Sequence, residues 1–255
     1  MSLIRLDHAR GITTITLDSP HNRNALSTQL MRELLAALDD AGSDPDVRVV
    51  VLDHTGPVFS SGADLSETAA AASTGDMPAN ILGDILAAVV SCPKPVIAAV
   101  RGSARAGGVG LIAAADLAVC AETATFAFSE VRIGVIPALI SATVLPRLAP
   151  RAAAELYLTG EIFDGTRAAG IGLVSTAVTV EKVDTVVRSW CSSLVRGAPN
   201  AVAATKRLLS QKPAIADIDD LAVLSLEFFG SAEGREGVAA FTEKRDPSWV
   251  PPATG

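Results

Sequence analysis

The pattern of hydrophobic and polar positions divides the chain into strand–helix units that are followed by helices. Residues 3–8 and 11–18 alternate β-branched and polar side chains around a short link, which predicts a β-hairpin. Ser27 is a typical N-cap residue for a helix whose leucines recur at helical spacing as far as Gly42. The continuous apolar run 47–52 is typical of a strand that is buried on both faces.

The middle of the chain repeats this strand–loop–helix order without repeating its sequence. The stretch 69–75 is rich in alanine and serine and predicts a mobile loop or a short frayed helix. The other expected elements are a helix start at 60–65, a helix at 81–90, a buried strand at 95–100, a loop at 101–107, a small-residue helix at 108–115, and short strands at 117–120 and 125–128.

After Pro146 the pattern becomes helical. Strand units first and helices last predict an α/β core with a helical C-terminal part, and no linker divides the chain into independent domains. The expected C-terminal helices are 151–159, 166–169, 181–195, 200–209 and 218–241.

Composition excludes several classes of protein. The 255 residues are 49% hydrophobic and 19% charged, which excludes a disordered chain. The net charge of −7 without a basic run argues against nucleic acid as a partner. Cys92, Cys120 and Cys191 are odd in number and far apart, which favours a reduced, cytoplasmic protein without disulfides. No signal-peptide core is present and no apolar run approaches the roughly 18 residues of a membrane span.

Two loops combine small residues with the start of a helix. Residues 58–65 and 102–111 each follow a strand and open a helix, so that backbone N–H groups can approach a ligand oxygen. Two such groups from separate helices could converge on one carbonyl oxygen and stabilise an oxyanion. The alternative is that the glycines only permit turns and close helix packing.

Glu130 lies in surroundings that would perturb a carboxylate. It follows the apolar strand 124–128 and precedes another apolar stretch, where solvation is poor. A carboxylate in such surroundings has a raised pKa and suits proton transfer near neutral pH. The alternative is a structural carboxylate that is paired with Arg132.

Seven motifs together resemble the enoyl-CoA hydratase/isomerase (crotonase) family. Their order and spacing run from about residue 4 to residue 247. The motifs are Asn22–Leu26, Phe59–Leu65, Ala99–Gly102, Gly107-Gly108, Asp116, Phe128–Pro137 and Phe241–Pro247.

The resemblance implies a spiral of ββα units in residues 1–195 and a helical region in 196–255 that is used in trimerisation. It implies an acyl-CoA thioester substrate, with coenzyme A as part of that substrate and no further cofactor, and a homotrimer or a dimer of trimers. The backbone N–H groups of Ala63 and Gly107 are the implied oxyanion donors, and Glu130 is the implied acid–base group. The implied substrate contacts are Arg23, Ala25, Ser61, Asp64, Leu65, Gly108, Pro137 and Lys244.

One departure from the family bears on the reaction. Family hydratases usually carry two glutamates, and the position of the first is occupied here by Gly110. Isomerisation of a 3-enoyl to a 2-enoyl thioester needs only one base. However, a hydratase branch that resembles 3-methylglutaconyl-CoA hydratase also has a Gly-Val-Gly run and a Glu-Val-Arg-(Ile/Leu)-Gly motif. We therefore expect a hydratase; an isomerase and an inactive acyl-CoA-binding or scaffold homologue remain open.

Other chemistries are weakly supported. Residues 108–113 match a dinucleotide-binding glycine pattern, but 101–107 separate them from the preceding strand. A Ser–His hydrolase using His54 lacks a G-x-S-x-G elbow, and no histidine has an acidic partner at metal-ligand spacing. The bulky segment 138–142 replaces a glycine-rich turn of the family and leaves the acyl-chain preference open. Asp116 is expected to satisfy buried backbone groups.

Overall fold

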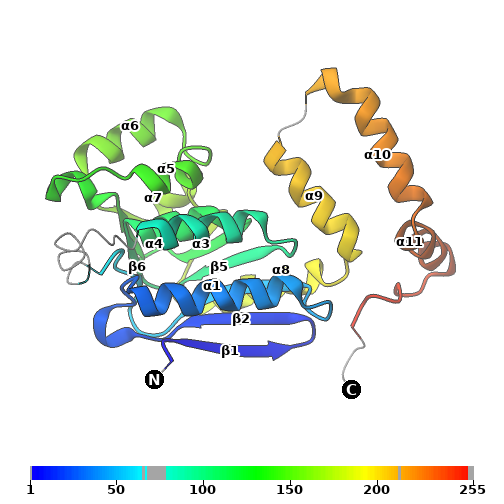
Figure 1. Cartoon of the computed structure of the whole chain (residues 1–255), viewed down its shortest axis with the longest axis horizontal. Coiled ribbons are helices and arrows are strands. Elements are labelled where there is room, and N and C mark those ends of the chain that lie inside the picture. The colour runs from blue at the N-terminus through cyan, green and yellow to red at the C-terminus, as the bar shows by residue number, and fades with distance from the viewer. Residues whose placement is uncertain (1, 65–66, 68–78, 212–213, 252–255) are drawn as a thin grey trace.

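The computed structural model describes residues 2–64, 67, 79–211 and 214–251 (Figure 1). The expected mobile stretch 69–75 and the candidate contact Leu65 lie outside these residues. All elements below belong to the described part of the chain.

The larger sheet has six strands in the order β1-β2-β3-β5-β7-β10. Strands β1 and β2 form an antiparallel hairpin, as predicted, and the other neighbours pair in parallel. Nearly every residue of β3 and all residues of β5 are buried, as their apolar runs predict. The bounds are β1 Ile4–Ala9, β2 Ile12–Leu17, β3 Val49–His54, β5 Val96–Val100, β7 Leu117–Ala121 and β10 Thr176–Val178.

The smaller sheet is formed mainly by strands that directly follow strands of the larger sheet in the chain. Its order is β4-β6-β8-β9, with β4 (Val58–Ser60), β6 (Ser103–Arg105) and β8 (Thr125–Ala127) in parallel and β9 (Phe163–Asp164) antiparallel to β8. The chain therefore passes from β3 to β4, from β5 to β6 and from β7 to β8 before it reaches a helical segment. This repetition is the expected spiral of ββα units.

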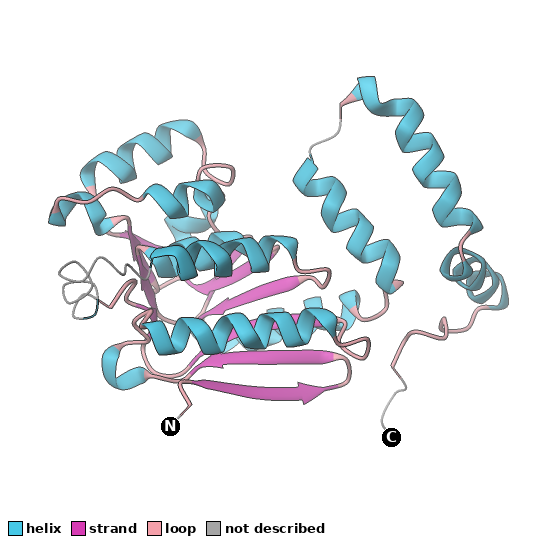
Figure 2. Cartoon of the chain, viewed as in Figure 1, coloured by secondary structure: helices cyan, strands magenta, loops and turns pink. Residues whose placement is uncertain are grey.

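Helices cover the sheets on several sides (Figure 2). Helix α1 (Thr28–Ser43) begins at its expected cap, because the Ser27 side chain accepts a hydrogen bond from Leu30 N. It packs beside α3 (Ala79–Ser91), and α3 packs beside α4 (Gly107–Ala114). The remaining helices of the core are η1 Pro20–Asn22, η2 Ser129–Ile133, α5 Ala138–Val144, α6 Pro150–Thr159, α7 Gly165–Gly170, η3 Val180–Lys182 and α8 Val183–Leu194.

The core is aliphatic, with a few buried phenylalanines. Ile15, Leu52 and Ile97 of the large sheet and Leu30 of α1 are almost fully buried. The three cysteines are free and buried in the same apolar surroundings. Among the described helices, none combines the length and the hydropathy that crossing a membrane requires.

The C-terminal helices form an arm that extends to one side of the core (Figure 1). They are α9 (Pro199–Gln211), η4 (Ile215–Asp217), α10 (Ile218–Gly230) and α11 (Ala232–Glu243). The prediction of one helix over 218–241 was wrong, because the backbone is extended at Ser231. The Ser231 hydroxyl accepts from Gly234 N and so caps a new helix.

Lys206 fastens α9 to the core. Its Nζ donates to the carbonyl oxygens of Val89 and Lys94, each at 3.1 Å, and pairs with Asp116 at 2.7 Å. Asp116 also accepts a hydrogen bond from Val96 N at 2.8 Å. The expectation that Asp116 satisfies buried backbone is therefore confirmed, with an ion pair in addition.

Candidate active site

A cavity of about 300 Å³ brings together three of the residues to which sequence analysis gave chemical roles. Ala63, Gly107 and Glu130 all line it, and so do Asp64 and Pro137. Most of its remaining wall is apolar and comes from α1, α3 and the segment that leads into α5. These apolar residues include Leu26, Met31, Leu82, Val135, Ile136, Leu139 and Ile140.

Ala63 is held in place by the segment that precedes α1. Leu26 and Ala63 form an isolated parallel bridge, in which Leu26 N donates to Gly62 O at 2.8 Å. Gly62 has φ +86°, a conformation that side chains other than glycine rarely adopt. No acceptor for the Ala63 N–H group is found in the described part of the chain. The amide is therefore available to a ligand in the cavity.

Gly107 is the first residue of α4, where a helix leaves its N–H groups without intrahelical partners. The preceding Ala106 has φ 49° and ψ −119°, an unusual backbone conformation for a residue with a side chain. A Cβ at Gly107 would lie 2.9 Å from Leu26 Cδ1 and 3.2 Å from Leu82 Cδ2. A side chain at position 107 would therefore push these two leucine side chains aside, whereas glycine leaves the backbone open to the cavity.

The two loops that carry these amides are in direct contact. A Cβ at Gly62 would lie 3.0 Å from both Ala106 Cβ and Arg105 O, and one at Gly108 would lie 2.8 Å from Ser60 Cβ. This close packing of backbone on backbone is what brings the two N–H groups to one cavity. Gly62 and Gly108, which pack the loops closely, are the direct chain neighbours of Ala63 and Gly107, whose amides face the cavity, so the two interpretations of the sequence are compatible.

Glu130 lies on η2, lines the same cavity as Ala63 and is half-buried. Burial raises the pKa of its carboxyl group, and a hydrogen bond from its own backbone amide opposes the shift. Oε2 is buried and has no hydrogen-bond partner among the described residues. The ion pair with Arg132 does not form, because Arg132 donates instead to Gly160 O at 3.1 Å and pairs with Glu161 at 2.6 Å.

Gly110, at the position of the first family glutamate, is packed against α5. Thr143 Oγ1 donates to Gly110 O at 3.0 Å, and the Ile140 side chain lies against the Gly110 Cα. The place from which a second carboxylate would enter the cavity is therefore apolar.

The other predicted contacts are more scattered. Arg23 is exposed, and its carbonyl oxygen accepts from Ser61 N at 3.0 Å, which links the two segments. Ala25 and Gly108 are buried beneath the cavity wall. Lys244 ends α11 on the arm and does not line the cavity within one chain (Figure 1). The roles of these residues stay predictions.

Sequence reasoning missed Glu67, a second carboxylate in the cavity wall. Its Oε2 accepts hydrogen bonds from both the backbone N and the hydroxyl of Thr28, each at 2.7 Å. Glu67 N in turn donates to Asp64 Oδ1 at 3.3 Å. Glu67 thus holds the start of α1. Spacing gave no signal for it, because Thr28 lies 39 residues away in the chain.

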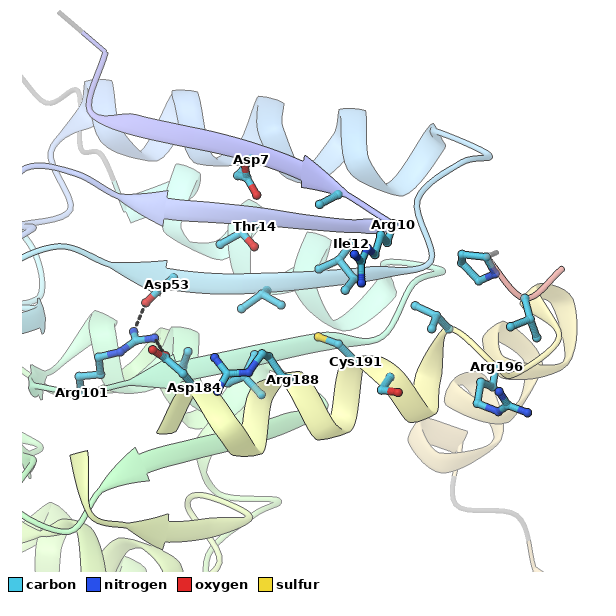
Figure 3. Close-up of a pocket in the computed structure, with 18 residues that line it drawn as sticks. Asp7, Arg10, Ile12, Thr14, Asp53, Arg101, Asp184, Arg188, Cys191 and Arg196 are labelled. Atoms are coloured by element: carbon cyan, nitrogen blue, oxygen red, sulfur yellow. Dashed lines mark hydrogen bonds and ion pairs between the residues drawn. The ribbon is translucent and has the colours of Figure 1, made fainter. Parts of the chain in front are cut away.

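A larger cavity of about 780 Å³ lies on the opposite face of the large sheet, against α8 (Figure 3). Arg101 bridges Asp53 of β3 and Asp184 of α8 there, which fastens the helix to the sheet. The backbone N of Arg101 donates to His54 Nε2 at 3.0 Å. The imidazole of His54 therefore accepts a backbone hydrogen bond at the end of β3. The structure gives no support to a Ser–His hydrolase. Ala63, Gly107 and Glu130 line the smaller cavity.

Comparison with known proteins identifies the family. The sequence profile described as "Enoyl-CoA hydratase/isomerase" matches residues 7–251. Carnitinyl-CoA dehydratase of Citrobacter koseri is 34% identical over 251 residues, covering 93% of this chain and 94% of the relative.

Two solved structures show the same fold. An enoyl-CoA hydratase of Mycobacterium smegmatis superposes with a TM-score of 0.90 at 32% identity, covering 97% of this chain and 98% of that one. An enoyl-CoA hydratase of Mycobacterium avium has a TM-score of 0.75 at 44% identity, covering 98% and 99%. The chain therefore belongs to the enoyl-CoA hydratase/isomerase family.

Proposed function

We propose that this protein is an enoyl-CoA hydratase that adds water across the 2,3 double bond of a 2-enoyl-CoA thioester. One observation carries the proposal: two unpaired backbone amides, of Ala63 and Gly107, share a cavity with a half-buried carboxylate whose Oε2 has no partner among the described residues. The similar proteins named above, a carnitinyl-CoA dehydratase and enoyl-CoA hydratases, support the same class of reaction.

The proposed mechanism uses the two amides for charge and Glu130 for protons. Glu130 takes a proton from water while the hydroxide oxygen bonds to C3, and the electrons of the double bond move toward the thioester carbonyl. The oxygen of the resulting enolate carries the negative charge, which the N–H groups of Ala63 and Gly107 stabilise. The protonated Glu130 then gives its proton to C2, which completes the addition and regenerates the carboxylate.

We further propose that the acyl group is uncharged and aliphatic. The charged side chains that line the cavity within the described residues are Asp64, Glu67 and Glu130, all acidic. A dicarboxylic acyl group of the glutaconyl type would place its own carboxylate among them without a cation, which is unfavourable. Branched aliphatic and straight-chain enoyl thioesters fit the apolar wall better.

A 3-enoyl-CoA to 2-enoyl-CoA isomerase is the second candidate. It is favoured by the apolar packing of Gly110 against Ile140, which leaves no second carboxylate at that point. In this reaction Glu130 would take a proton from C2 and return it to C4, while the same two amides stabilise the enolate. No change in the rest of the site is required.

We propose that the chain assembles as a homotrimer or a dimer of trimers through its arm. Large apolar side chains on the arm are exposed in the single chain, which is typical of a surface that meets a partner. In such an assembly Lys244 and Arg23 are the candidate cations for the coenzyme A phosphates. Size-exclusion chromatography with light-scattering detection measures the mass of the assembly. The exposed residues include Leu209, Ile215, Leu226, Phe229, Val238 and Phe241.

The function is tested with a panel of 2-enoyl-CoA and 3-enoyl-CoA thioesters, including straight, branched and glutaconyl types. A product that gains the mass of one water establishes hydration. Unchanged mass with new absorbance from conjugation establishes isomerisation. Tight binding of every acyl-CoA without turnover would instead establish an inactive binding homologue. Preferred turnover of the glutaconyl type would contradict the proposed acyl class.

A further inference from the structure

Two buried polar atoms near the cavity lack hydrogen-bond partners within the described residues. They are Glu130 Oε2 and the hydroxyl oxygen of Tyr157. A buried polar group without a partner is unfavourable, so each such atom calls for an explanation. Two of them, one able to accept and one able to donate, lie in neighbouring elements.

Tyr157 is fixed behind the segment that carries Glu130. Its ring, on α6, lies 4.5 Å from the ring of Phe128, centroid to centroid, two residues before Glu130. The end of α6 is also tied to η2, because Arg132 donates to Gly160 O and pairs with Glu161. Tyr157 does not line the cavity itself. It can therefore act only through Glu130.

The protonation of Tyr157 suits a donor. Burial raises the pKa of its hydroxyl group and the nearby Glu130 carboxylate raises it further, whereas the Ser141 hydroxyl opposes the shift. Tyr157 is therefore neutral at physiological pH and carries its proton. In the structure Ser141 donates its own proton to Pro137 O at 2.6 Å, so it offers the neutral Tyr157 hydroxyl only an acceptor. Its opposing effect on the pKa concerns the ionised tyrosine, to which Ser141 would have to turn and donate.

We propose that Tyr157 is the positioning residue of Glu130: its hydroxyl donates a hydrogen bond to Oε2 and holds the other carboxylate oxygen toward the cavity. The two groups are not hydrogen-bonded in the structure, but the terminal torsion of a glutamate is soft, so the carboxylate is free to turn toward the hydroxyl. A charged acceptor also makes a stronger bond than the Ser141 hydroxyl. The part of the inference that concerns proton transfer rests on the proposed function.

This arrangement explains how Glu130 is supported without a glutamate at position 110. The side of the cavity at Gly110 is filled by Ile140, so support comes from α6 instead. The other charged groups around Glu130 are Arg132 on its own element, which is paired with Glu161, and Asp64 and Glu67, which line the same cavity. All of them are unchanged when only the Tyr157 hydroxyl is removed.

The test measures the titration of Glu130 directly in the full-length protein. Glutamate labelled with ¹³C at the side-chain carboxyl is incorporated, and the Glu130 signal is assigned by its loss in Glu130→Gln. Tyr157→Phe keeps the ring that contacts Phe128 and removes the donor, so the midpoint of Glu130 is expected to rise by about half a pH unit or more. Ser141→Ala, the control, removes the competing acceptor and should leave the midpoint unchanged or lower it.

Tyr157 is the chain's one tyrosine, which offers a second test in an unmutated sequence. Uniform incorporation of 3-fluorotyrosine makes this hydroxyl more acidic and a stronger donor, so the Glu130 midpoint is expected to fall. A midpoint that is the same in wild type, Tyr157→Phe and fluorotyrosine protein overturns the proposal.

The activity data separate this inference from the proposed function. If the protein is an active hydratase or isomerase, the acid limb of kcat/KM should move upward in Tyr157→Phe by the same amount as the NMR midpoint. If no enoyl thioester is turned over but the midpoints shift as expected, the proposed function fails and the positioning role stands. If turnover is found but the midpoints and the acid limb do not move, the positioning role fails alone.

Discussion

Ile140 occupies the space into which any side chain at Gly110 would project: a Cβ built on Gly110 would lie 2.4 Å from Ile140 Cγ2 and 2.8 Å from Ile140 Cβ. Helices α4 and α5 are therefore packed against each other at a glycine. Gly110, which takes the position of a glutamate in the two-glutamate hydratases, is thus matched in size to Ile140. Restoring a carboxylate at 110 would require a change at 140 as well.

Gly110→Ala tests this packing. In an open helix interior the change should stabilise the protein by about 0.5–1 kcal/mol, because alanine is the better helix former. Here the Cβ collides with Ile140, and we expect a loss of about 1–3 kcal/mol. Thermal unfolding measures the difference.

The matched control is Gly170→Ala, since nothing lies within 4 Å of a Cβ at that helical glycine. It should be neutral or stabilising. Combining Gly110→Ala with Ile140→Ala should recover part of the loss. A Gly110→Ala protein that is more stable than wild type would contradict the close packing.

Glu130→Gln tests the proposed proton carrier. The amide has nearly the same shape but cannot accept and return a proton, so kcat should fall by about 10²–10⁴. The rate of substrate turnover measures this effect. Glu161→Gln serves as the control, because Glu161 is an exposed partner of Arg132 and lies outside the cavity. Near-normal kcat in Glu130→Gln would remove Glu130 from the mechanism.

The raised pKa of Glu130 also predicts how stability depends on pH. In the folded protein this carboxyl holds its proton to a higher pH than the ordinary value of 4.5. At a pH between the ordinary pKa and the raised pKa of the folded protein, the folded state binds more protons than the unfolded state. The free energy of unfolding therefore falls as the pH rises through this range. Glu130→Gln should therefore be more stable than wild type at pH 7, and the difference should vanish below about pH 4. Melting curves from pH 4 to pH 8 measure it; equal stability of the two proteins at pH 7 would contradict the burial of the charge.

Ala63→Pro tests the first oxyanion donor. Proline has no N–H group, so the folded variant should lose about 10²–10³ in kcat. Ala63→Gly keeps the N–H group and should retain most of the activity. Circular dichroism establishes that both variants fold. Equal rates for the two would show that this amide does not contact the thioester oxygen.

Lys206→Met tests how the arm is fastened to the core. Methionine keeps helix propensity and apolar contact but leaves the Asp116 carboxylate and two carbonyl groups without this partner. We expect a loss of about 1–3 kcal/mol in the free energy of unfolding, measured with urea. Arg207→Met, at the next and exposed position, is the control and should change stability by less than about 0.5 kcal/mol.

The sequence determined the features that repeat locally. The hairpin, the buried strands and the cap at Ser27 follow from alternation, apolar runs and a side-chain oxygen at a helix start, each of which involves residues close together in the chain. The family motifs also pointed to Ala63, Gly107 and Glu130, which the fold brings to one cavity. The capping signal at Ser231 was present in the sequence as well, but helical periodicity on both sides hid it.

Tertiary structure alone decided the contacts between distant segments. Ile140 against Gly110, Glu67 on Thr28, and Tyr157 against Phe128 join residues that lie 29 to 39 positions apart. Such contacts depend on how helices and sheets pack in three dimensions, and no local periodicity records which side chain will fill a given space. The sequence therefore supplied the candidate amides of Ala63 and Gly107 and the candidate base Glu130, while packing decided that Ile140 fills the space beside Gly110.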